Sequence, residues 1–359
     1  MTKTIQTFLS LGVVLLTLNP IVACSPAADS GGEQAESAIN QSVTEQWQAA
    51  GTIPLSVESH QTVVVGDFVY LLGGWNSRTY AHDEVFFTRL SAEGTLTDWQ
   101  EATAPMPLKL QHHQASAHAG SIYVIGGDDQ FGPKSNVSDR IFRAVPDSEG
   151  DIPDWEEVGR LPAPRTIHAV TIVRDRLYVI GGSREFHKGA VMADTVFAAV
   201  IATDGSVGEF EELNPFPTPI SWLTATAVDD RIVAISGKVG WDAPLTNQVW
   251  LAAVTEDGSL SGFEPIGETV ARQRHTTVLI DGRLILIAGG ARRVLSRVEA
   301  ATVEADGSLS DWQMLPPLPA ARYAHAAFVH GGSVYVSGGF VKYGSGETSN
   351  KIFRLDLEK

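Results

Sequence analysis

The chain has 359 residues, of which 43% are hydrophobic and 19% charged, with 34 glycines and 18 prolines. This is the balance of a globular protein with many turns, so the composition excludes a disordered chain and a long coiled coil. The formal net charge of -16 at pH 7 excludes a protein that binds a nucleic-acid backbone, because such proteins carry a basic surface.

The first residues have the pattern of an export signal. Lys3 is the only charged side chain before an apolar run over residues 8–18, which is too short to span a membrane comfortably. The run leads into Ile21-Val22-Ala23-Cys24, which resembles the lipidation motif of bacterial lipoproteins. The resemblance implies cleavage before Cys24 and acylation of its thiol. A plain secretory signal with an incidental cysteine is the alternative.

Cys24 is the only cysteine, which favours a lipid anchor over half of a disulfide. The segment that follows lacks aromatic residues and is rich in Ser, Ala, Gly and Glu, as flexible tethers are. By resemblance to lipoprotein sorting in enteric bacteria, Ser25 favours the outer membrane, on its periplasmic or surface side. We therefore predict a signal peptide over 1–23, an acylated tether over 24–40 and a folded domain over 41–359. The domain would stay in the cell envelope and touch the membrane only through the lipid on Cys24.

Internal repeats dominate the rest of the chain. An apolar block that ends in a glycine pair, or a close variant of it, recurs six times. Thirteen residues before the first position of this pair stands a histidine, replaced by leucine in the fourth copy. The six blocks cover 68–74, 122–127, 177–182, 232–237, 284–290 and 334–339, and the six positions are His60, His113, His168, Leu223, His275 and His325. Their spacing of roughly 50–55 residues is typical of one β-propeller blade.

Each unit predicts four short strands. The apolar block is the second strand, and its apolar residues at nearly every position indicate a strand buried on both faces. An Asp or Asn two residues before a β-branched residue begins the third strand, and an aromatic residue five positions after a glycine marks the fourth. Two-residue connections such as Gly66-Asp67 fit tight hairpins between the first and second strands.

The phase of the repeat predicts how the ring closes. The last copy ends on its third strand at Leu357, and the missing fourth strand is expected at the front of the domain, between Ser42 and Trp47. We therefore predict an all-β fold, a six-bladed propeller with four antiparallel strands per blade. The N-terminal strand would complete the last blade and so cover its edge.

Together, the Arg-x-x-His pattern, the Tyr-[Val/Leu]-[Ile/Leu/Ser]-Gly-Gly blocks and the aromatic positions resemble the kelch-repeat propellers over residues 42–359. The type is that of the central domain of galactose oxidase. The resemblance implies the same six-bladed fold, but the family contains adaptors, enzymes that act on carbohydrates and many secreted proteins. Fold alone therefore carries little information on function.

The repeat places one candidate site at the mouth of the central channel. The repeat histidines begin the innermost strands, and three arginines stand three residues before their histidine. One hypothesis is a cationic ring that attracts an acidic ligand. We favour the alternative, in which these side chains are structural and bond carbonyls of neighbouring strands. Two tryptophans that depart from the repeat are expected at the same rim, where they would stack on a sugar ring or only fill space. The candidate ligand-binding residues are Arg165, His168, Trp222, Trp241, Arg272, His275, Arg322 and His325.

No catalytic residue can be singled out, and no cofactor is predicted. A copper radical site is excluded, because it needs a cysteine within the propeller. Five histidines on separate blades are not expected to converge on a metal. We therefore favour a scaffold that binds a protein partner or a glycan through one loop-rich face. A carbohydrate-active enzyme of the sialic-acid mutarotase or epimerase type, using the same mouth, is the alternative, and a purely structural module is a third.

Overall fold

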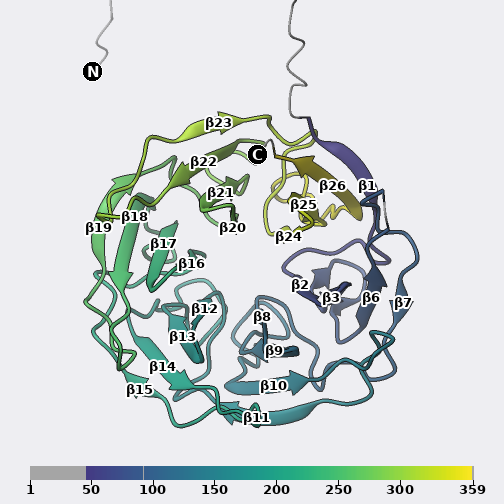
Figure 1. Cartoon of the computed structure of the whole chain (residues 1–359), viewed down its shortest axis with the longest axis horizontal. Coiled ribbons are helices and arrows are strands. Elements are labelled where there is room, and N and C mark those ends of the chain that lie inside the picture. Colours follow the sequence, from purple (N-terminus) through teal and green to yellow (C-terminus); the bar gives the residue numbers. More distant parts are fainter. Residues whose placement is uncertain (1–45, 92, 358–359) are drawn as a thin grey trace, which may run out of the picture. The chain divides into compact units, whose positions relative to one another are not determined.

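The computed structural model describes residues 46–91 and 93–357, so the predicted signal peptide, Cys24 and the tether lie outside the described residues. Within this part of the chain no helix is long and apolar enough to cross a membrane. The described residues form six four-stranded antiparallel sheets arranged around a central axis, together with one short hairpin (Figure 1). The predicted six-bladed propeller with four strands per blade is confirmed.

The blades follow one another along the chain. Blade 1 contains β2 (Gln61–Val65), β3 (Phe68–Leu72), β6 (Val85–Arg89) and β7 (Gln100–Glu101), and its loop carries the hairpin β4 (Trp75–Asn76) and β5 (Tyr80–Ala81). Blade 2 contains β8 (Gln114–His118), β9 (Ser121–Ile125), β10 (Arg140–Ala144) and β11 (Glu156–Arg160), and blade 3 contains β12 (Ala169–Val173), β13 (Arg176–Ile180), β14 (Val196–Val200) and β15 (Glu211–Glu212). Blade 4 contains β16 (Thr224–Val228), β17 (Arg231–Lys238), β18 (Leu245–Ala253) and β19 (Glu264–Glu268). Blade 5 contains β20 (Thr276–Ile280), β21 (Arg283–Ile287), β22 (Val298–Thr302) and β23 (Gln313–Leu315), and blade 6 contains β24 (Ala326–His330), β25 (Ser333–Ser337), β26 (Lys351–Asp356) and β1 (Gln48–Thr52).

The hydrophobic core lies between the blades. The second strand of each blade is buried along almost its whole length, as in β9 and β25, where every residue is buried. The glycine pair that ends this strand allows close packing. A Cβ on Gly127 would lie 2.7 Å from the Cβ of His113, and Gly127 has a φ of +95°. This contact explains why the glycine pair and the histidine recur together.

The N-terminal strand completes the last blade, as predicted, but it lies further along the chain. Strand β1 pairs with β26 through Gln48 opposite Arg354, and it follows Trp47 rather than preceding it. The indole Nε1 of Trp47 donates a hydrogen bond to the carbonyl of Pro316 in blade 5, at 2.8 Å. This bond holds the tryptophan side chain against the neighbouring blade, and the ladder begins at the next residue, Gln48.

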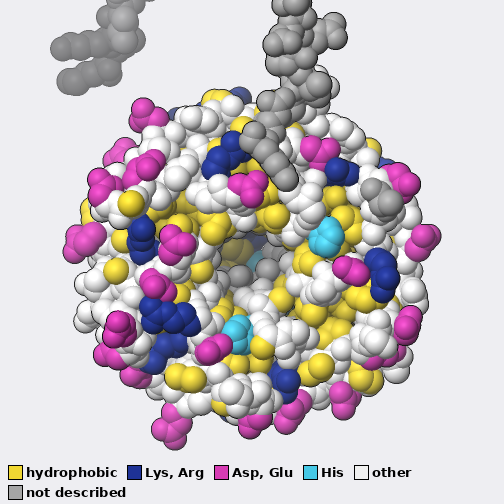
Figure 2. All heavy atoms as spheres, in the orientation of Figure 1, with side chains coloured by type: hydrophobic (Ala, Val, Ile, Leu, Met, Phe, Trp, Pro, Cys, Tyr) yellow, Lys and Arg dark blue, Asp and Glu magenta, His cyan; other side chains and the backbone are white. Residues whose placement is uncertain are grey.

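Tyrosines of the second strands tie neighbouring blades together. The Tyr178 hydroxyl in blade 3 donates to the carbonyl of Gly258 in blade 4 at 2.7 Å, and equivalent bonds leave Tyr70, Tyr123 and Tyr335. The last of these runs from blade 6 to Gly94 in blade 1 and so crosses the closure of the ring. Figure 2 shows one face of this ring, with most Asp and Glu side chains at its periphery and a central opening bordered by hydrophobic and uncharged atoms.

Candidate functional site

The residue before each repeat position has a left-handed backbone conformation and lies at the mouth of the channel. We call these six residues the neck ring. They are Ser59, His112, Ile167, Trp222, Arg274 and Ala324, with φ values of 50°, 53°, 51°, 57°, 52° and 55°. Backbone hydrogen bonds link neighbours in the ring, for example from the Ser59 N–H to the Ala324 carbonyl at 2.8 Å. The repeat therefore imposes one backbone geometry on six different side chains.

Paired bridges hold each neck residue in place. In every blade the residue before the neck position pairs with the residue that follows the glycine pair, or its variant, at the end of the second strand. The pairs are Glu58 with Trp75, Gln111 with Asp128, Thr166 with Ser183, Ser221 with Lys238, Gln273 with Gly290 and Tyr323 with Phe340. These bridges bring the loops between the second and third strands to the same face as the neck ring.

Two side chains of the neck ring extend far beyond their own blades. The Trp222 ring of blade 4 lies 4.9 Å, centroid to centroid, from the His112 ring of blade 2. The guanidinium carbon of Arg274 in blade 5 lies 3.9 Å from the centroid of Trp222. The Nη1 atom of Arg274 is also 3.7 Å from Oε2 of Glu58 in blade 1. These contacts narrow the mouth and separate an outer pocket from an inner one.

The outer pocket has a volume of about 310 Å³, with aromatic walls and a polar floor. Its aromatic side chains are Trp75, Tyr80, Phe131, Phe186 and Phe340, and its floor includes Glu58, Gln111, His112 and Arg274. The inner pocket has a volume of about 230 Å³ and lies among the neck ring and the first residues of the innermost strands. His112 and Arg274 line both pockets.

A buried carboxylate organises one side of the floor. Asp128 is fully buried and accepts hydrogen bonds from Gln111 Nε2 at 2.8 Å and from the Thr166 hydroxyl. Its Oδ2 atom is also 2.9 Å from Nδ1 of His112. The other ring nitrogen of His112, Nε2, is buried and has no hydrogen-bond partner. Other buried ring nitrogens among the described residues also lack a partner, but His112 is the residue of this group that lines both pockets, which makes its Nε2 a candidate for contact with a ligand.

The structure places the repeat histidines between blades. Nε2 of His325 lies 2.9 Å from the Thr276 hydroxyl of the preceding blade, and Nε2 of His275 lies 3.2 Å from the Thr224 hydroxyl. Both histidines, with His168, line the inner pocket. Burial lowers the pKa of His168 and His275 to about 3, so these imidazoles are neutral at physiological pH. They therefore contribute no positive charge to the mouth.

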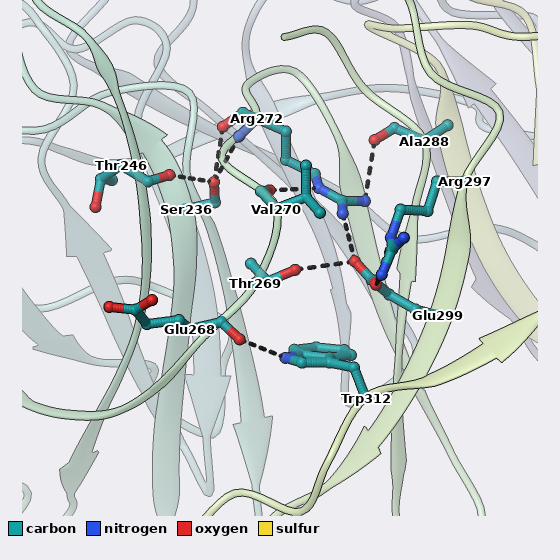
Figure 3. Close-up of polar contacts among 10 residues, drawn as sticks. All are labelled: Ser236, Thr246, Glu268, Thr269, Val270, Arg272, Ala288, Arg297, Glu299 and Trp312. Atoms are coloured by element: carbon teal, nitrogen blue, oxygen red, sulfur yellow. Dashed lines mark hydrogen bonds and ion pairs between the residues drawn. The ribbon is translucent and has the colours of Figure 1, made fainter.

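Arg165, Arg272 and Arg322 do not form a cationic ring at the mouth. Their exposed fractions are 1%, 0% and 1%, and none lines the outer or the inner pocket. Arg272 lies between blades 4 and 5, where it donates to the Val270 and Ala288 carbonyls and pairs with Glu299 (Figure 3). Arg322 donates to the Gly338 carbonyl at 2.9 Å. The arrangement matches the structural alternative, in which these arginines bond carbonyls of nearby strands.

Trp222 lines the inner pocket, whereas Trp241 lines neither the inner nor the outer pocket. They pack with Phe186, whose ring centroid is 5.9 Å from Trp222 and 6.0 Å from Trp241. The sequence reasoning missed His112, Asp128, Arg274, Glu58 and Phe131 as site residues. The sequence holds a signal for two of them, His112 and Arg274. Both stand one residue before the repeat histidine, and this position carries a different residue in every blade, whereas the histidine recurs.

Among the described residues no group of three or more His, Cys, Asp or Glu side chains is placed to hold a metal ion. A profile of the kelch motif matches residues 321–359. The kelch-like protein terF of Aspergillus terreus is 25% identical over 299 residues, which cover 80% of this chain and 62% of that protein. The leucine-zipper-like transcriptional regulator 1 homolog of Drosophila melanogaster is 22% identical over 317 residues, covering 83% of this chain and 31% of the relative.

The chain thus spans less than two thirds of the length of these curated relatives. The solved structure of YjhT superimposes with a TM-score of 0.67 and covers 86% of this chain and 97% of that one. Its sequence identity is 12%, so this likeness concerns the fold alone.

Proposed function

We propose that this kelch-repeat β-propeller is a binding protein that takes a small, neutral, ring-shaped ligand bearing hydroxyl groups, such as a saccharide unit, in its outer pocket. Kelch propellers generally bind protein partners. For this chain we infer that the loop-rich face recognises a glycan, free or carried by such a partner.

The observation that carries the proposal is the combination of aromatic walls with a polar floor. Tyr80 and Phe131 are 65% and 59% exposed, although large aromatic side chains are usually covered. A sugar ring offers an apolar face to such walls and hydroxyl groups to a floor of carboxylate, guanidinium, amide and imidazole. The volume of about 310 Å³ lies at the lower end of the range of ligand pockets, which suits one or two rings.

The charges of the floor favour a neutral ligand over an acidic one. Arg274 is paired with Glu58, and its guanidinium stacks on Trp222. A carboxylate ligand would have to compete with Glu58 for this arginine. A neutral hydroxyl can bond either partner without separating the pair.

The test is a titration of the full chain with neutral monosaccharides and disaccharides, in which binding is measured by tryptophan fluorescence and by calorimetry. We expect Trp75→Ala and Phe131→Ala to weaken binding at least tenfold. Met314→Ala removes an exposed apolar side chain from β23, outside both pockets, and should leave binding unchanged. Absence of binding by all sugars, or equal affinity in the pocket variants, would overturn the proposal in favour of a protein surface.

We further propose that the protein is held in the cell envelope by a lipid on Cys24. The support is the export signal over 1–23, the lipoprotein-like motif and the position of the only cysteine. Cys24→Ser should move the protein from the membrane fraction to the soluble fraction and abolish incorporation of a labelled fatty acid. Retention of both label and membrane association in the variant would disprove the anchor.

A further inference from the structure

The imidazole of His112 is held by three neighbours and satisfied at only one of its nitrogens. Phe186 and Trp222 meet it edge to face, with centroids 4.6 Å and 4.9 Å away. Asp128 lies 2.9 Å from Nδ1, while Nε2 has no partner. The aromatic contacts fix the plane of the ring, so the free nitrogen has a defined position beside the pockets.

The hydrogen bonds of Asp128 determine which nitrogen carries the proton. A carboxylate only accepts, and Asp128 already accepts from Gln111 and Thr166. The contact with His112 therefore requires an N–H at Nδ1. In the neutral imidazole this leaves a lone pair on Nε2, which makes Nε2 a hydrogen-bond acceptor.

We propose that Nε2 of His112 is the acceptor that selects the ligand, by taking a hydrogen bond from one particular hydroxyl of the ring-shaped molecule. Asp128 is a positioning residue, because it acts through the tautomer of His112. The inference rests on the proposed function and adds the atom that makes it selective. Nε2 is shielded from solvent in the structure, so the proposal requires that ligand binding displace the atoms that cover it. A ligand without that hydroxyl would leave the buried acceptor unpaired.

The first test concerns the tautomer and needs no ligand. Nitrogen NMR of the isotope-labelled full chain should show the hydrogen of His112 on Nδ1. In Asp128→Asn the new amide can keep its oxygen toward Gln111 and present its NH₂ group to His112 and Thr166. The hydrogen should then move to Nε2. Asp129→Asn removes the same charge one residue away and should leave the tautomer unchanged. A hydrogen on Nε2 in the unaltered protein would overturn the inference.

The second test compares sugars that differ by one hydroxyl. D-glucose, D-galactose and D-mannose are titrated beside their monodeoxy derivatives. In the unaltered protein one monodeoxy derivative should bind at least tenfold more weakly than its parent sugar. His112→Phe, which removes Nε2, should reduce affinity for the parent to the same level and cause no further loss for that derivative, as a double-mutant cycle requires for two groups that interact.

His112→Phe keeps an aromatic ring between Phe186 and Trp222, so a loss of discrimination in this variant reports the loss of Nε2. If His112→Phe does not fold, the tautomer of His112 in the unaltered protein still decides the inference. Equal discrimination in His112→Phe and in the unaltered protein would overturn this inference and leave the proposed function standing. Failure of all three sugars and their derivatives to bind would overturn both, even with the tautomer as expected.

Discussion

Replacing Arg272 with methionine tests whether the buried arginines are structural. The side chain is completely buried between blades 4 and 5, and its Nε atom donates to the Val270 carbonyl at 2.9 Å. A second bond reaches the Ala288 carbonyl, and the charge is paired with Glu299 (Figure 3). Methionine keeps much of the apolar stem and removes the guanidinium, so Arg272→Met measures the loss of these polar contacts.

The expected loss is below that of a fully broken buried ion pair. Glu299 keeps two other partners, Arg297 at 2.5 Å and the Thr269 hydroxyl at 2.9 Å, so its carboxylate is not left alone. Breaking a buried pair outright costs about 3–5 kcal/mol, and we expect about 2–3 kcal/mol here. For a domain of this size the unfolding entropy is roughly 0.65 kcal/mol per degree. The melting temperature should therefore fall by about 3–5 °C.

The assay is differential scanning calorimetry of Arg272→Met, Glu299→Gln and the double variant. The two residues should show a coupling free energy in this cycle, because they contact each other. Arg297→Met, which removes the partly exposed partner of the same carboxylate, should lower the melting temperature by only about 1–2 °C. Affinity for a saccharide should be unchanged in Arg272→Met. An unchanged melting temperature in Arg272→Met together with a loss of saccharide binding would refute this reasoning and indicate that Arg272 contributes to ligand binding.

Three further predictions concern the ring. Gly51 in β1 has a φ of +114° and faces the backbone of blade 1 with no room for a Cβ, so Gly51→Ala should loosen the closure and speed proteolysis. Gly282→Ala, also at positive φ but in open space, should be milder. Tyr178→Phe removes the hydroxyl bonded to Gly258 and should cost about 1 kcal/mol, seen as a melting point lowered by about 1.5 °C; no change would contradict it. Finally, burial lowers the pKa of four histidines from 6.5 to about 3. Below pH 6.5 the unfolded chain therefore binds protons that the folded ring excludes. The free energy of unfolding should fall as the pH drops from 6.5 toward 5. His168→Leu, which copies blade 4, should make the fall shallower in calorimetry, and an equal slope would disprove the assignment.

The ring could be predicted because every blade repeats the same backbone requirements. The glycine pair and the histidine recur together because the histidine lies where a Cβ on the second glycine would have to lie. The spacing of the repeat places Trp47 at the end of the N-terminal strand, whereas β1 begins one residue after it. Its bond to Pro316 in the neighbouring blade, which sequence spacing does not display, places it before the strand instead.

The candidate site was harder to predict, because repetition identifies structural residues more readily than functional ones. Arg272 and His275 occupy recurring positions and are both buried between blades, and of the two only His275 also lines the inner pocket. Arg274, between them, breaks the repeat and lines the pockets. Its reach to Glu58, and that of Trp222 to His112, depend on side-chain directions across several blades. Those side-chain directions are set by how the blades are arranged in the ring, which the sequence pattern of a single blade does not contain.

The neck ring also bears on how such a protein can change over time. The residue before each neck position is held by a main-chain bridge, which does not depend on the side chain at the neck position itself. The side chain at each of the six positions is therefore open to exchange without altering the strands behind it. Ser59, Ile167 and Ala324 show that small and apolar residues are accepted in the same geometry as Trp222 and Arg274. Ligand preference can thus diverge one blade at a time, and a library varied at these six codons would sample new specificities on an unchanged scaffold.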